Sequence, residues 1–163
     1  EITHGFDDEG SRYDAKGNLK SWWTPADRAR FEKKAQIVRN QFDAFTVADG
    51  VHVNGKLTLG ENIADLGGLS IALDAYQLQL ARTGRNDIDG FTPEQRFFLG
   101  FALFERENTR PESAKTQVLT DPHAPGKFRI NGPAANIEAF YEAFGVKKGD
   151  SLYREPAKRA KIW

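Results

Sequence analysis

The chain has 163 residues, which suits one domain with a core of its own. Its 23 basic and 23 acidic residues cancel. This balance argues against a nucleic-acid partner, because nucleic-acid-binding proteins carry a basic excess. The absence of cysteine excludes disulfides and thiolate chemistry. No apolar run approaches the roughly 20 residues of a transmembrane helix, so we expect no membrane span in this segment.

Residues 1–6 are predicted to end a helix, which stops at Gly5 and the acidic run after it. The chain contains no methionine, and no capping residue precedes its first apolar residue. Either the N-terminus is processed or engineered, or the chain begins inside a pre-existing helix. The ExxH spacing of Glu1 and His4 and the motifs that follow it along the chain favour the second interpretation.

Hydrophobic spacing and turn residues predict a mainly α fold with one or two short β-hairpins. Helices are expected over Pro25 to about Phe45, about 61–82, Pro93 to about Asn108, 111–119, and from Pro133 or Asn136 to near Phe144. Hairpins are expected at 14–18 and over 51–59, around the Asn54-Gly55 pair. The segment 121–132 is expected to be a loop, since it contains two prolines and two glycines.

Glu1 and His4 are three residues apart, so on a helix they share one face. In the HExxH motif, two histidines four residues apart bind zinc and the glutamate activates water. Only ExxH is present here. Taken alone, this spacing more often belongs to an exposed pair at a helix end.

Glu61 and Asp65 lie four residues apart on a helix face whose neighbours are apolar. Catalytic zinc sites often use two histidines and a glutamate, and a ligating histidine usually donates its other ring N–H to a carboxylate. Glu61 as ligand with Asp65 as its supporting carboxylate fits this chemistry. A solvated acidic pair at a helix N-terminus fits the sequence equally well.

The Asp121-Pro122-His123 segment and Arg129 lie in the predicted loop. A histidine can stabilise an oxyanion, and an arginine can hold a substrate carbonyl. On spacing alone, a surface histidine and a structural arginine are the more common case.

His52 is interpreted as a partly exposed strand residue. The core is expected to contain Trp22, Trp23, Phe97, Phe98, Phe101 and Phe104.

Together, these pieces resemble the neprilysin and endothelin-converting-enzyme family of zinc metallopeptidases, a thermolysin-like group. The resemblance rests on EITHGFDDEGSRYDAKGNLKSWWT, on NGKLTLGENIADLGGL, on TDPHAPGKFRINGPAANIEAFYEAFGVKKGD and on the terminal IW, and it covers essentially the whole chain. It implies that 1–163 is the C-terminal helical part of a thermolysin-like catalytic domain, starting inside the HExxH helix. The first zinc ligand would directly precede Glu1.

The family implies a role for each matching residue. Glu1 matches the general base, while His4 and Glu61 match the second and third ligands of a Zn2+ cofactor. Asp65 matches a carboxylate that orients a ligating histidine, and Asp7 is a candidate for the same role toward His4. His123 matches the oxyanion stabiliser, and Arg129 matches the residue that holds the substrate backbone. Short peptides are the expected substrates.

The sequence departs from the family at two places. Relatives usually carry a tryptophan directly after the aromatic run that ends here in Phe104-Glu105, and that residue helps line the pocket for the side chain after the cut. The cysteines of animal members are absent, with Gly145-Val146 where one is common, which suggests a bacterial homologue. The upstream helical region that closes the cleft and a peptide-binding strand with an Asn-Ala-aromatic motif are also absent.

With two protein ligands, the chain alone is expected to bind zinc weakly and to hydrolyse little or nothing. Its expected partner is the N-terminal part of the same protein, with which it could form a nicked enzyme. The alternative function is a non-catalytic peptide-binding or interaction module on a peptidase scaffold. The family resemblance favours a periplasmic or otherwise extracytoplasmic location.

Overall fold

The computed structural model describes residues 2–163. In chain order its elements are η1 (Ile2–Phe6), η2 (Gly10–Arg12), α1 (Pro25–Asp43), β1 (Thr46–Ala48), β2 (Val51–His52), α2 (Leu59–Thr83), α3 (Pro93–Phe104), α4 (Pro111–Thr120), α5 (Gly126–Ala134), α6 (Glu138–Phe144) and η3 (Pro156–Lys158), where η marks 3₁₀ helices. Helices dominate, and the strands β1 and β2 form a short antiparallel pair. The predicted mainly α fold with a short hairpin is confirmed.

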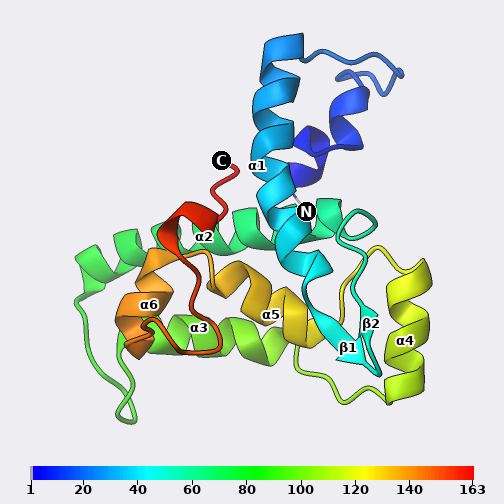
Figure 1. Cartoon of the computed structure of the whole chain (residues 1–163). Helices are drawn as coiled ribbons and strands as arrows, with labels where there is room; N and C mark the ends of the chain where they lie inside the picture. The colour runs from blue at the N-terminus through cyan, green and yellow to red at the C-terminus, as the bar shows by residue number, and fades with distance from the viewer. Residues whose placement is uncertain (1) are drawn as a thin grey trace.

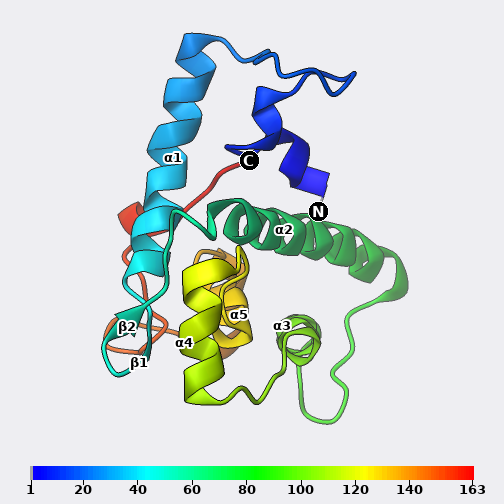
Figure 2. The same ribbon diagram turned by 90° about the vertical axis from the view of Figure 1, so that its right-hand side faces the viewer.

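The long helix α2 runs through the middle of the molecule (Figure 1). The N-terminal segment with η1 lies on one side of α2, and α5 and α3 lie on the other side, as the two views agree (Figure 2). The helix α1 stands across the N-terminal end of α2 and leads down to the β1–β2 pair. Because α2 packs against both η1 and α5, its first turns lie between the two segments that carry the candidate site residues.

Capping residues explain where the helices begin. Thr24 accepts a hydrogen bond from the backbone N–H of Asp27, and Pro25 occupies the first helical position of α1. Thr92 and Gln95 form a capping box at the start of α3. These are the residues from which the sequence predicted both helix starts.

One core cluster joins α1, α2 and α5. Phe42, Leu59 and Ile63 are fully buried there, with Val38 and Phe128 packed beside them. Burying apolar side chains of this size stabilises the fold by about 1.5–3 kcal/mol each. This cluster fixes the N-terminal half of α2 against α1 and α5.

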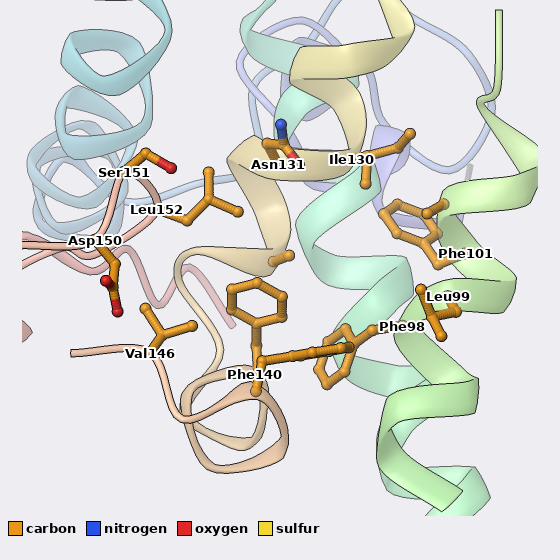
Figure 3. A pocket seen from close by; sticks show the side chains of 13 residues that line it. Phe98, Leu99, Phe101, Ile130, Asn131, Phe140, Val146, Asp150, Ser151 and Leu152 are labelled. Atoms are coloured by element: carbon orange, nitrogen blue, oxygen red, sulfur yellow. The ribbon is translucent and has the colours of Figure 1, made fainter. Parts of the chain in front are cut away.

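A second cluster lies at the middle of α2, where Leu69 and Leu73 meet Phe98 of α3. Phe98 packs edge-on against Phe140 of α6, with ring centroids 5.4 Å apart. Beside this cluster, a cavity of about 450 Å³ opens between α3, α5, α6 and the segment 146–152 (Figure 3). Its walls are apolar except at Asn131, Asp150 and Ser151.

The predicted hairpin around Asn54-Gly55 is wrong. The strands instead meet at Asp49-Gly50, where both residues take positive φ (48° and 77°). The Asn54 side chain accepts the backbone N–H groups of Lys56 and Leu57 and so makes the turn that leads into α2. At 14–18, the chain forms an isolated antiparallel bridge between Tyr13 and Leu19.

The segment 121–132 is not a loop throughout, because α5 begins at Gly126 and includes Arg129. The helix α3 ends at Phe104, which is earlier than expected.

The aromatic residues that were predicted to lie in the core differ in burial. Phe98 is buried, whereas Phe104 is 80% exposed and Trp22 is 50% exposed. His52 lies exposed in β2, as the sequence indicated. Within residues 2–163, no helix is long and apolar enough to cross a membrane.

Candidate metal and catalytic site

Glu61 lies at the centre of the candidate site, in the first turn of α2, and faces two histidines from distant parts of the chain. Its Oε1 is 3.3 Å from Nε2 of His4, which belongs to η1. Its Oε2 is 3.2 Å from Nε2 of His123, which lies just before α5. The fold therefore brings together three residues that the sequence singled out separately.

The ring of His4 is oriented by Asp7. Nδ1 of His4 lies 2.7 Å from Oδ2 of Asp7, and Asp7 is almost fully buried. The other carboxylate oxygen of Asp7 accepts the backbone N–H groups of Glu9 (3.0 Å) and Gly10 (2.8 Å). When Nδ1–H donates to Asp7, Nε2 presents its lone pair toward Glu61.

His123 is held in a similar way by Asp121. One oxygen of Asp121 accepts the backbone N–H of His123 (2.9 Å) and lies 2.8 Å from its Nδ1. The backbone hydrogen bond, followed by the side-chain one, lowers the pKa of Asp121 below its ordinary value. Gln117 also donates to the backbone carbonyl of His123 (3.3 Å). These contacts fix the ring with Nε2 directed at Glu61, while the side chain stays 42% exposed.

Arg129 forms a two-pronged pair with Asp65. Its Nε and one terminal nitrogen each donate to the Asp65 carboxylate at 2.8 Å. Its other terminal nitrogen lies 3.4 Å from Oε1 of Glu105. The hydrogen bond to Asp65 is the main cause of a raised pKa at Arg129, so the guanidinium stays charged. Among the described residues, Asp65 is thus hydrogen-bonded to Arg129. Its expected role of orienting a ligating histidine stays a prediction.

Two donor atoms of this site fit a zinc ion. Two ligands at about 2.1 Å from a tetrahedral zinc lie about 3.4 Å apart, and His4 Nε2 and Glu61 Oε1 are 3.3 Å apart. The second oxygen of Glu61 is buried, and among the described residues it accepts no hydrogen bond, although His123 Nε2 lies 3.2 Å away. Within residues 2–163, no group of three or more His, Cys, Asp or Glu side chains could hold a metal. The structure therefore offers two zinc donors. The predicted base Glu1 lies outside the described residues.

Two cavities lie at the candidate site, and Glu61 borders one of them. One of about 510 Å³ is bordered by His4, Asp7, Asp8, Glu9, Asn54, Lys56, Leu57, Gly60, Glu61 and Pro122. The other, of about 540 Å³, is bordered by Ala64, Asp65, Gly68, Leu69, Ala72, Phe97, Phe101, Phe104, Glu105, His123 and Arg129. We call the second one the aromatic cavity. It places apolar walls directly beside His123 and Arg129.

Two supporting carboxylates, those of Asp121 and Glu105, were not predicted from the sequence. Asp121 lies two residues before His123, a spacing at which an aspartate side chain often contacts the residue that follows its turn. Glu105 gave no local signal, because its partner Arg129 lies 24 positions away on another helix.

The chain is similar to known metallopeptidases. Residues 1–160 match the model of peptidase family M13. The whole chain is 42% identical to an endothelin-converting enzyme homolog of Locusta migratoria and 40% identical to human neprilysin, and it covers 22% of each. It superposes on a zinc metalloprotease of Mycobacterium tuberculosis in complex with an inhibitor, with a TM-score of 0.93, 46% identity and 26% of that chain covered. The chain thus spans about a fifth of the length of these curated relatives.

Proposed function

Because the chain belongs to peptidase family M13, we propose that it supplies most of the reaction centre of a zinc-dependent endopeptidase that hydrolyses short peptides. The convergence of His4, Glu61 and His123 carries this proposal, since each histidine Nε2 lies within 3.3 Å of the same carboxylate. The titles of solved relatives describe zinc metalloproteases, which supports the same chemistry.

In this proposal, His4 and Glu61 hold the zinc, and Asp7 keeps the His4 ring in the tautomer that can ligate. A zinc ion bound there supplies a Lewis acid that lowers the pKa of water toward about 7. Glu1 takes a proton from the attacking water and passes it to the leaving amine. The role of Glu1 rests on the family resemblance.

His123 and Arg129 stabilise the charge that develops on the peptide oxygen. In the imidazolium form, His123 donates from both nitrogens, so Asp121 holds Nδ1–H while Nε2–H, on the side of Glu61, donates to a substrate oxygen bound there. Asp65 occupies Nε and one terminal nitrogen of Arg129, which leaves the other terminal nitrogen to face the cleft beside Glu105. The guanidinium is thereby held in one orientation before substrate binds.

We further propose that residues 1–163 alone bind zinc weakly and hydrolyse little. Catalytic zinc sites use three protein ligands, and the described residues offer two donors, on His4 and Glu61. In the family pattern, the remaining ligand precedes Glu1. The rest of the peptidase would then be the partner of this chain, and it would restrict access to short peptides.

The complete product of the gene that encodes this chain should be assayed beside residues 1–163, on a short amidated, internally quenched peptide. We expect zinc-dependent hydrolysis by the complete product and at least a 100-fold lower rate for the chain alone. His123→Ala should lower kcat, whereas His52→Ala, at an exposed histidine outside the site, should not. A complete product that binds the peptide without zinc or hydrolysis would instead indicate a non-catalytic binding module.

The extracytoplasmic location also stays a proposal, based on the family resemblance. Fractionation of the source cells, with the complete gene product detected by antibody, would test it. Recovery in the cytosolic fraction alone would overturn it.

A further inference from the structure

Glu105 occupies the position at which the family resemblance implies a tryptophan, and it lies beside His123 and Arg129. It follows the last residue of α3, and its side chain is 15% exposed. Its carboxylate borders the aromatic cavity together with His123 and Arg129. Any substrate side chain that enters this cavity therefore meets a carboxylate that the family pattern replaces with an indole.

The charges around the aromatic cavity do not cancel. With His123 neutral, Arg129 is the one cation among the residues that border it, while Asp65 and Glu105 are both acidic. Asp65 takes two hydrogen bonds of 2.8 Å from Arg129, whereas Glu105 has a longer contact of 3.4 Å. One guanidinium thus faces two carboxylates, and Glu105 is the less completely paired one. The C-terminal end of α3 adds partial negative charge at the same place.

The apolar walls suit a long side chain that ends in a cation. The rings of Phe97, Phe101 and Phe104 border the cavity, and Phe104 is 80% exposed. Aliphatic stems of lysine and arginine pack well on such surfaces, and their charged heads are attracted to aromatic faces and to carboxylates. A volume of about 540 Å³ has room for either side chain.

We propose that the aromatic cavity selects peptides with lysine or arginine directly after the cleaved bond, and that Glu105 determines this selectivity. The inference rests on the proposed function, because that function places the bond at His123 and Arg129. An ion pair that remains partly solvated, at the end of a stem that packs on aromatic rings, favours the cationic side chain by roughly tenfold over an uncharged one of equal length.

The test uses the complete gene product and peptides that differ only at the residue after the cleaved bond. Lysine and arginine are compared with norleucine, which keeps the aliphatic stem without the charge. We expect kcat/KM for lysine to exceed that for norleucine by roughly tenfold. Glu105→Gln should reduce this ratio to about one, and Glu105→Trp should invert it. Asp150→Asn changes a carboxylate in the remote cavity of Figure 3 and should leave the ratio unchanged.

Binding of the same peptides with a non-hydrolysable reduced bond, measured by calorimetry, separates the two proposals. A lysine preference that depends on Glu105, in a protein that hydrolyses none of the peptides, would overturn the proposed function and leave the cavity assignment in place. Zinc-dependent hydrolysis that prefers norleucine, or a lysine preference that survives Glu105→Gln and Glu105→Leu, would overturn the inference.

Discussion

Nε2 of His4 lies 3.3 Å from Oε1 of Glu61, and this approach depends on two glycines of α2. A Cβ at Gly60 would lie 2.9 Å from the carboxylate of Asp7, and one at Gly67 would lie 3.0 Å from the side chain of Thr3. Glycine at these two positions lets η1 rest directly on the helix that carries Glu61. The short distance between His4 and Glu61 is therefore a consequence of how closely η1 packs on α2.

Asp7→Asn should weaken zinc binding by the complete gene product by about 10- to 100-fold. The asparagine oxygen can still accept the backbone N–H groups of Glu9 and Gly10, but its NH₂ group then faces Nδ1 of His4. That arrangement favours the tautomer with a proton on Nε2, which cannot ligate. Competition with a chromogenic chelator measures the change.

The matched control is Asp14→Asn, because Asp14 also accepts backbone N–H groups in a turn but lies outside the site. Equal zinc affinities for Asp7→Asn and the parent protein would show that Asp7 does not set the His4 tautomer.

Arg129→Ala should lower the unfolding free energy of the chain by about 2–4 kcal/mol, because it leaves Asp65 mostly buried without its cation. In urea unfolding, the double variant Asp65→Ala/Arg129→Ala should cost less than the sum of the single variants by about 1–3 kcal/mol. Additivity within about 0.5 kcal/mol would mean that the pair contributes no coupling energy.

Gly132→Ala should destabilise the chain by about 1–3 kcal/mol. Its Cβ would lie 2.5 Å from the ring of Phe42, a side chain that is 1% exposed and has no room to move. Gly100→Ala in α3 meets nothing within 4 Å and should instead stabilise the helix by about 0.5–1 kcal/mol. Thermal unfolding of the two variants should therefore shift Tm in opposite directions, and a shift in the same direction would contradict the packing at Gly132.

Asp121 should titrate below its ordinary pKa, because the backbone N–H and Nδ1 of His123 both bind its carboxylate. A depressed folded-state pKa stabilises the fold above the unfolded-state pKa of about 3.9, and this contribution is lost as pH falls through the folded value. Carbon-13 NMR of the carboxyl groups measures the titration. His123→Ala should raise the pKa of Asp121 part of the way, since the backbone bond remains; no change would show that the ring makes no bond.

Much of the helical framework follows from local chemistry that the sequence displays. The Thr24-Pro25 and Thr92-Pro93 caps fix the starts of α1 and α3. The start of α5 could not be predicted from local sequence, because its first residue, Gly126, follows a proline, and both residue types are typical of turns. Tertiary packing against α2 makes this segment helical.

Some contacts of the site could also be predicted from the sequence, and others could not. The spacing of His4 and Asp7 lies within one turn, so their contact could be anticipated from the sequence. The approach of His123 to Glu61 followed only from the family resemblance, because it depends on how α5 packs against α2. The contact of Glu105 with Arg129 required the structure, since nothing local links the C-terminal end of α3 to α5.

The zinc content and zinc dissociation constant of the complete gene product test whether His4 and Glu61 are zinc ligands. His4→Ala and Glu61→Ala are compared with His52→Ala and Glu142→Ala, which change exposed residues of the same types. We expect one zinc per chain in the parent and control proteins, and at least 100-fold weaker binding in both site variants. Unchanged zinc affinity in either site variant would contradict the assignment of His4 and Glu61 as ligands.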